Sequence, residues 1–125
     1  MRQATVYIDR EALQYNLNRV KQLAPNTQIV SMVKANAYGH GIKDCLVALK
    51  STDAFGVACL EEALEIRELG YQHPITLIEG VFSEDEMHVV VEQKIECVIH
   101  HAQQVEWLQA HKAAYIGQGL KVWVK

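Results

Sequence analysis

The sequence predicts an α/β fold in which helices cover a parallel sheet. Five short apolar runs recur along the chain, and each of the first four is followed by an amphipathic stretch of helical length; they start near Ile29, Ala54, Ile75, Ile95 and Leu120. The runs "IVSMV" and "ECVI" are almost continuously apolar, which is typical of strands buried on both faces. This alternation predicts parallel strands in one domain of 125 residues.

Two further elements precede the alternation. The segment "TVYID", Thr5 to Asp9, resembles a strand, which would be an extra one at the N-terminus. Asp9 is a helix-capping residue type and stands directly before "REALQYNLNRVKQLA". We therefore expect a helix from Arg10 to Ala24.

Boundary signals mark two of the later helices. The segment "SEDE", Ser83 to Glu86, fits a capping box at a helix start. Gly70 follows "EEALEIREL" and fits the glycine that ends a helix. The charges from Glu61 to Glu68 are interpreted as a solvated helix face with local ion pairs.

Two arrangements of a parallel sheet are compatible with these elements. A doubly wound open sheet of five strands would be complete at this length, whereas a closed eight-stranded barrel needs about 250 residues. Length alone favours the open sheet. In both arrangements ligands bind at the carboxyl ends of the strands.

Composition points to a small-molecule partner. The net charge is −3 and no block of Lys and Arg occurs, which argues against nucleic acid and against an anionic membrane surface. The N-terminus has no apolar run of signal-peptide length, and no window approaches the roughly 18 apolar residues of a membrane span. We expect a cytoplasmic protein with three reduced, mostly buried thiols, Cys45, Cys59 and Cys97.

Lys34 is the first candidate for chemistry. It ends the apolar run of "IVSMVKANAYGHG", Ile29 to Gly41, and so lies at the carboxyl end of the first predicted strand. Partial desolvation there favours the neutral amine, a nucleophile that attacks carbonyl groups. Such an amine forms a Schiff base with a carbonyl substrate or with pyridoxal phosphate. The alternative is a lysine that merely extends its charge into water.

The segment "VKANAYGHG", Val33 to Gly41, resembles the pyridoxal-phosphate lysine motif of alanine racemases. The resemblance continues in "ATVYIDREAL", "DAFGVACLEEALEIRELG", "PITLIEGVFSEDEM" and "LKVWVK", and it is greatest to members from Gram-negative bacteria. It implies a cytoplasmic, homodimeric isomerase that interconverts L- and D-alanine for peptidoglycan, with pyridoxal 5'-phosphate as its cofactor.

The resemblance also implies a different architecture from the one that length favours. Family members have a (β/α)8 TIM-type barrel followed by a β-domain, and the chain ends at Lys125, about five strands into that barrel. We therefore expect residues 1–125 to be the N-terminal portion of the barrel domain, with Thr5 to Asp9 outside the barrel. The isolated 125-residue chain is expected to self-associate and to be inactive.

For the site, the resemblance implies that Lys34 is both the Schiff-base lysine and the base on the D-alanine face. Tyr38 would contact the cofactor phosphate through its hydroxyl. The opposite base, a tyrosine of the other subunit, and the substrate-binding arginines would lie beyond Lys125. Asn36, Gly39 and Gly41 are interpreted as loop-forming residues, and His40 as a structural residue of the same loop.

Two remaining features are assigned no chemistry. His100 and His101 are adjacent, point to different sides and have no carboxylate or thiol at ligand spacing, so no metal site is expected. Lys125 matches a family lysine that can be carbamylated, but a solvated lysine explains it equally well. Two alternative functions stay open: a related racemase of broader amino-acid specificity, and a non-catalytic pyridoxal-phosphate-binding fragment.

Overall fold

Strands and helices alternate along the computed structural model, which describes residues 4–115, 117 and 119–125. The elements are α1 (Arg10–Leu23), β1 (Val30–Met32), α2 (Lys34–Tyr38), α3 (Ile42–Ala48), β2 (Ala54–Val57), α4 (Leu60–Glu68), β3 (Ile75–Leu77), α5 (Glu84–Glu92), β4 (Glu96–Ile99), α6 (Ala102–Ala110), α7 (Lys112–Tyr115) and β5 (Val122–Val124). All five predicted strands are therefore confirmed, each starting within two residues of its expected position.

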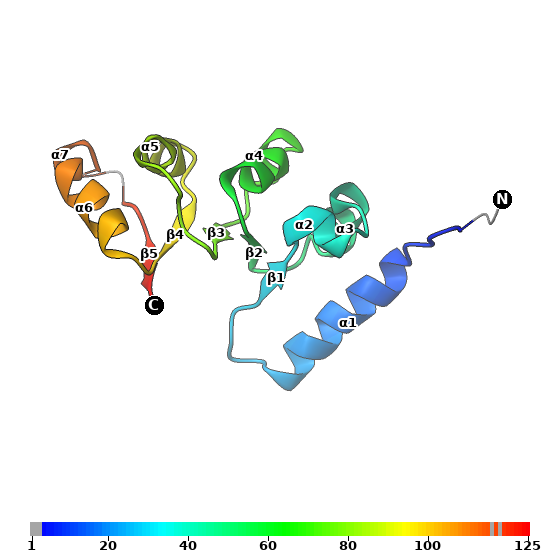
Figure 1. Ribbon diagram of the computed structural model, residues 1–125. Helices are drawn as coiled ribbons and strands as arrows, with labels where there is room; N and C mark the ends of the chain where they lie inside the picture. Colours follow the sequence, from blue (N-terminus) through cyan, green and yellow to red (C-terminus); the bar gives the residue numbers. More distant parts are fainter. Residues whose placement is uncertain (1–3, 116, 118) are drawn as a thin grey trace.

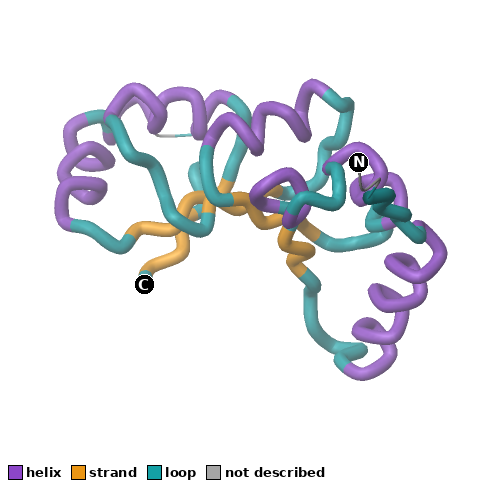
Figure 2. Tube along the Cα trace, turned by 45° about the vertical axis from the view of Figure 1, so that its right-hand side comes forward, coloured by secondary structure: helices purple, strands orange, loops and turns teal. Residues whose placement is uncertain are grey.

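The five strands form one parallel sheet in the order β1-β2-β3-β4-β5. Helices α3, α4, α5 and α6 lie along the same side of this sheet, which curves as an arc (Figures 1 and 2). A doubly wound sheet reverses its strand order and carries helices on both faces. The open-sheet arrangement that length favours is therefore wrong, and the architecture is an arc of a (β/α)8 barrel.

The core lies between the sheet and its helices. Its largest fully buried side chains come from strands and helices alike and include Phe55, Leu46, Ile66, Ile75, Leu77 and Met87. Every residue of β2 and β3 is buried, whereas all three residues of β5 are exposed. Burial is thus greatest at the centre of the arc.

A glycine lets the sheet pack closely on its inner face. A Cβ placed on Gly56 of β2 would lie 2.4 Å from Met32 Sδ and 3.2 Å from Val30 Cγ1, both on the neighbouring strand. Met32 therefore occupies the space that any larger residue at position 56 would need.

Helix α1 packs against α3 beside the first strand (Figure 1). Asp9 caps it as predicted, since its Oδ1 accepts a 2.9 Å hydrogen bond from Ala12 N. Arg10 forms an ion pair with Asp44 of α3. Residues 4–9, by contrast, form no strand, so the extra N-terminal strand is not confirmed; a strand needs a hydrogen-bonded neighbour, and none of the described residues pairs with this segment.

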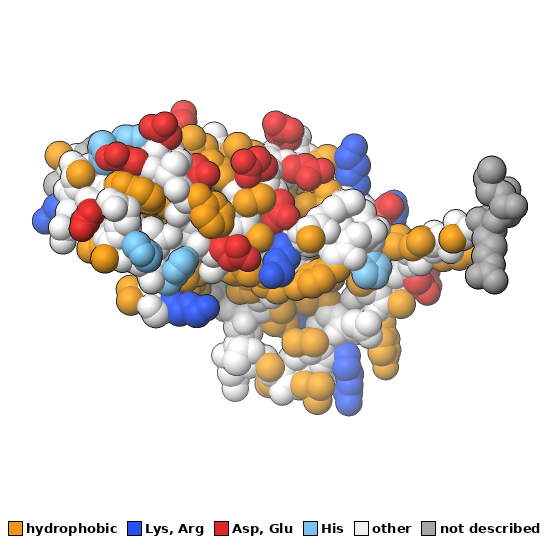
Figure 3. Space-filling view, in the orientation of Figure 1, with side chains coloured by type: hydrophobic (Ala, Val, Ile, Leu, Met, Phe, Trp, Pro, Cys, Tyr) orange, Lys and Arg blue, Asp and Glu red, His pale blue; other side chains and the backbone are white. Residues whose placement is uncertain are grey.

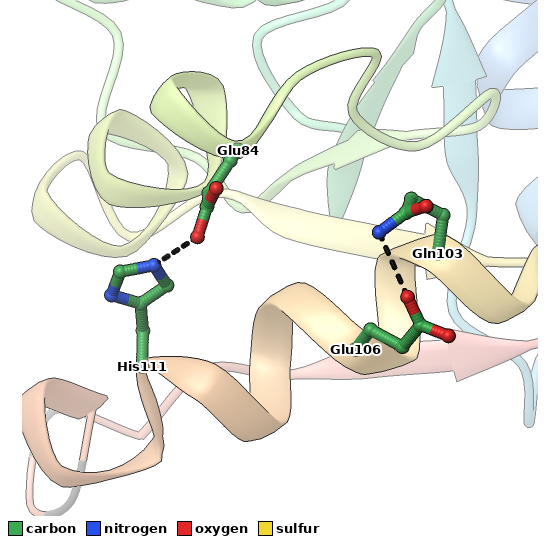
Figure 4. Close-up of polar contacts among 4 residues, drawn as sticks. All are labelled: Glu84, Gln103, Glu106 and His111. Carbon is green, nitrogen blue, oxygen red and sulfur yellow. Dashed lines mark hydrogen bonds and ion pairs between the residues drawn. The ribbon is translucent and has the colours of Figure 1, made fainter.

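The outer surface of the helices carries many charged side chains among apolar ones (Figure 3). Carboxylates gather over α4 and α5 (Figure 3). Glu84, at the start of α5, faces His111 at the end of α6 and forms an ion pair with it when the imidazole is protonated, while Gln103 Nε2 donates a 2.9 Å hydrogen bond to Glu106 (Figure 4). Within the described residues, no helix combines the length and the hydropathy needed to cross a membrane.

Candidate functional site

Lys34 lies at the carboxyl edge of the sheet, as predicted. Strand β1 ends at Met32, and the fully buried Val33 continues the ladder by donating a 2.9 Å hydrogen bond to Gly56 O. Lys34 is the next residue, and its side chain is half-buried. The sheet therefore fixes the backbone on one side of the lysine.

The residues after Lys34 form a left-handed turn. Ala35, Asn36, Ala37 and Tyr38 have φ values of 53° to 56°, and Gly39 follows with φ 82°. Left-handed backbone costs about 1–2 kcal/mol for each residue other than glycine. This segment is therefore strained, and the surrounding structure must hold it in place.

Several hydrogen bonds hold the turn from within. Ala37 N donates to Val33 O at 2.9 Å, and Gly41 N donates to Asn36 O at 3.0 Å. Asn36 Oδ1 accepts a 2.8 Å hydrogen bond from Ile42 N at the start of α3. Asn36 and Gly41 thus have the loop-forming roles that the sequence suggested.

His40 also contacts the backbone of the left-handed turn. Its Nδ1 lies 2.8 Å from Ala37 O, a backbone acceptor inside the turn. A ring engaged with the backbone in this way helps to close the turn. This contact agrees with the structural role expected for His40.

Glu62 holds the turn from outside, and the sequence analysis missed it. Its Oε1 accepts a 2.6 Å hydrogen bond from Ala35 N, and its Oε2 accepts a 2.8 Å bond from Ala58 N. The sequence pattern predicts a solvated helix face from Glu61 to Glu68, and for Glu62 that prediction is wrong. Its position, third in α4 after the N-cap Cys59, was the available signal, because a carboxylate there reaches back to the preceding loop.

Tyr38 presents its side chain to solvent four residues after the lysine. It is 60% exposed and is the last residue other than glycine in the left-handed turn that starts at Ala35. An amine and a phenolic hydroxyl thus stand on one short segment at the carboxyl edge of the sheet. An amine suits an aldehyde, and a hydroxyl suits a phosphate oxygen.

The cysteines are core residues rather than nucleophiles. Cys45 and Cys97 are buried, Cys59 is half-buried, and none of the three forms a disulfide. Burial raises the pKa of the Cys97 thiol to about 11, and burial also raises the pKa of Cys45 and Cys59. All three therefore stay protonated near neutral pH.

The two histidines after β4 have structural contacts. His100 Nε2 lies 2.8 Å from Glu79 O, and His101 is the N-cap of α6, with Nδ1 accepting from Gln103 N at 3.2 Å. The two rings thus have different contacts: His100 contacts the loop after β3, and His101 caps α6. Lys125 donates its backbone N–H to Ile99 O at 3.0 Å, which extends the pairing of β5 with β4.

A sizeable hollow lies at the opposite edge of the sheet. It has a volume of about 490 Å³ and is lined by the starts of several strands, including Val30, Ala54 and Thr76. In barrels of this kind the amino edge serves stability and the carboxyl edge carries the chemistry. We therefore assign the candidate site to Lys34 and its turn.

Comparison with known proteins identifies the family. Residues 8–125 match the family described as alanine racemase, N-terminal domain. The curated alanine racemase of Legionella pneumophila (strain Corby) is 50% identical over 125 residues, which are 99% of this chain and 34% of that protein. The chain thus spans about a third of the length of this relative.

Solved structures show the same likeness. The structure of alanine racemase from Acinetobacter baumannii is 80% identical with a TM-score of 0.92, over 99% of this chain and 35% of that one. The structure of alanine racemase from Bartonella henselae with covalently bound pyridoxal phosphate is 28% identical with a TM-score of 0.75, over 86% of this chain and 32% of that one.

Proposed function

We propose, because this chain belongs to the alanine racemase family, that it carries the cofactor lysine of an enzyme that interconverts L- and D-alanine. The observation that carries the proposal is Lys34 at the carboxyl end of β1, directly before a strained turn with the family-like sequence "VKANAYGHG". The wider proposal is a cytoplasmic homodimer that supplies D-alanine for peptidoglycan. It includes no nucleic-acid, membrane or metal partner.

The residues at the site fit pyridoxal phosphate. The half-buried Lys34 offers one primary amine for the cofactor aldehyde, and the exposed Tyr38 hydroxyl offers a hydrogen bond to the phosphate. When bound, pyridoxal phosphate withdraws electrons from the α-carbon of an amino acid and so acidifies its α-hydrogen.

Lys34 has two tasks in this proposal. Its Nζ holds the cofactor between turnovers, and its free amine then takes up and returns a proton on the D-alanine face. The strained turn keeps the lysine backbone in one place, which favours proton transfer because the amine must lie within hydrogen-bond reach of the α-carbon's proton.

Racemisation also requires a base on the opposite face. By resemblance to the family, this base is a tyrosine of the other subunit, in the part of the family members that residues 1–125 do not match. We therefore propose that the 125-residue polypeptide alone does not racemise alanine, since a proton removed from one face could not be returned on the other.

A racemisation assay on the natural full-length protein tests the proposal. The protein is supplied with pyridoxal phosphate and assayed on a panel of amino acids. We expect alanine to be racemised fastest. Replacing Lys34 with Ala should lower the rate roughly 10³-fold or more, given the usual contribution of a positioned base. Lys43→Ala, at an exposed position of α3, is the matched control and should keep the wild-type rate.

Other outcomes of that assay would change the proposal. Faster racemisation of another amino acid would favour the related racemase of broader specificity. Cofactor binding without turnover of any amino acid would favour a non-catalytic binding protein. Full activity in Lys34→Ala would refute the role of this lysine.

A further inference from the structure

The Glu62 carboxylate joins two neighbouring loops at the carboxyl edge of the sheet. One oxygen accepts from Ala35 N, the amide directly after Lys34, and the other accepts from Ala58 N, the amide directly after β2. We propose that Glu62 is the positioning residue for Lys34, holding the left-handed turn against the adjacent strand through these two bonds. This inference rests on the proposed function, which makes Lys34 the reactive group.

The amide of Ala35 needs a partner from outside the turn. The following amides of Ala37, Gly39 and Gly41 all donate to carbonyls within the segment from Val33 to Ala37. Ala35 N donates instead to Glu62, 27 residues away in sequence. The carboxylate therefore fixes the point at which the chain leaves the sheet and enters the strained turn.

The charge of Glu62 suits this task. Hydrogen bonds to an ionised acceptor are roughly twice as strong as neutral ones. Glu62 also lies in the first turn of α4, where the helix dipole favours a negative charge. Both effects strengthen the hydrogen bonds by which Glu62 binds the two loops.

The third position of the helix also carries a loop-binding side chain in the next two helices along the sheet. Their hydrogen-bond partners can be compared with those of Glu62. Glu86 and Gln104 also stand third in their helices, α5 and α6. Glu86 accepts a 2.8 Å hydrogen bond from Phe82 N, in its own loop. Gln104 accepts from His100 N at 2.9 Å and donates to Val81 O at 3.0 Å, so it also joins two loops.

The chemistry of the partners separates these cases. Gln104 faces two donors, His100 N and His101 N, and one acceptor, Val81 O; an amide side chain satisfies all three because its oxygen accepts and its nitrogen donates. Glu62 faces two donors, and only a carboxylate has two acceptor oxygens. In Glu62→Gln the NH2 group would oppose one of the two backbone N–H groups, so the variant could hold only one loop while keeping the shape of the side chain.

The test compares Glu62→Gln with Glu65→Gln in the natural full-length protein. Glu65 is an exposed carboxylate one turn further along the same helix, so its replacement removes the same charge away from both loops. We expect Glu62→Gln to weaken pyridoxal-phosphate binding roughly tenfold or more, as loss of a charge-assisted bond implies. Glu65→Gln should stay within about twofold of wild type.

Two readouts distinguish positioning from general stability. In racemisation of alanine, Glu62→Gln should lower kcat more than it changes KM, because a displaced Lys34 affects proton transfer rather than substrate contact. The backbone amide resonances of Ala35 and Ala58 should shift in Glu62→Gln and stay unchanged in Glu65→Gln, even without cofactor. Equal binding, kcat and amide shifts in the two variants would overturn the proposal.

Hydrogen exchange of the wild-type protein tests the bond between Ala35 N and Glu62 even if Glu62→Gln does not fold. The amide of Ala35 should exchange at least about tenfold more slowly than a free amide, although the residue is exposed. Exchange at the free rate would refute the bond. If pyridoxal phosphate does not label Lys34 in wild type, the proposed function fails, whereas altered amides without altered cofactor binding would refute the positioning role alone.

Discussion

Lys34 owes its position to residues that carry no reactive chemistry of their own. Val33 ties the backbone before it to β2, and the left-handed residues Ala35 to Tyr38 follow it. Glu62 then links Ala35 to the loop after β2. At the scale of single residues, the candidate site is thus a lysine held by backbone hydrogen bonds on both sides.

Tyr38 offers a test at this scale. If its hydroxyl contacts the cofactor phosphate, Tyr38→Phe should weaken pyridoxal-phosphate binding by roughly fivefold to tenfold, the usual effect of one hydrogen bond. Thermal stability should not change, because the side chain is 60% exposed. Cofactor titration followed by absorbance measures the effect. Tyr15→Phe on α1, at a 69% exposed position, is the control, and equal affinities of the two variants would exclude the contact.

Cys97 gives a prediction about alkaline pH. Burial raises its pKa from 9.0 to about 11, so the folded state disfavours the thiolate while the unfolded state ionises near pH 9. Unfolding therefore becomes easier as pH rises from 9 to 11, with a loss of about 2 kcal/mol from this group. Urea unfolding at several pH values should show a smaller loss in Cys97→Ala. Identical pH dependence in both proteins would contradict the assignment.

At the scale of elements, side chains at helix starts organise the loops on the carboxyl edge. Ser83 is the N-cap of α5, and its Oγ accepts a 3.3 Å hydrogen bond from Glu86 N. Glu86 returns a bond to Phe82 N, one residue before the N-cap. Ser83 is thus the N-cap, as predicted, but the capping box is only half formed, because Glu86 accepts from Phe82 N rather than from Ser83 N.

Ser83→Ala should cost about 1 kcal/mol of unfolding free energy, the usual value for loss of an N-cap. Chemical denaturation measures it. Ser51→Ala is the control, because Ser51 is exposed, lies outside the helices and engages Lys21 through its backbone carbonyl rather than its hydroxyl. A loss no larger than that of the control would show that the cap is energetically unimportant.

The elements could be predicted where the signal was local. Strand starts, the Asp9 cap and Gly70, which has φ 86° after α4, all follow from residue type and spacing. The strand expected from Thr5 to Asp9 depends on a distant pairing partner, which no local pattern specifies. For Glu62, the bond to Ala58 N could have been inferred from its place at the start of α4, whereas the bond to Ala35 N joins residues 27 positions apart, which no local pattern specifies.

At the scale of the whole molecule, strand order decides the architecture. Five parallel strands in sequential order, with their helices on one side, form an arc and bring the carboxyl ends of β1 and β2 together. Length favoured the wrong arrangement, and only the family resemblance predicted the right one. Among the described residues, β1 and β5 each pair along one edge only.

Unpaired strand edges recruit other chains. We therefore predict that the 125-residue polypeptide, expressed alone, self-associates at micromolar concentration. Val122, Trp123 and Val124 of β5 are exposed and provide an apolar edge. Light scattering after size exclusion measures the mass, and Val124→Lys should reduce association. A monomer at all concentrations would contradict the prediction.

The most direct test of the account is to locate the cofactor on the chain. The natural full-length protein is incubated with pyridoxal phosphate, reduced with borohydride and digested, and the labelled peptide is identified by mass spectrometry. The account predicts one dominant adduct, on Lys34, and its loss in Lys34→Ala but not in Lys43→Ala. Label spread evenly over exposed lysines such as Lys43 and Lys50, with no preference for Lys34, would contradict it.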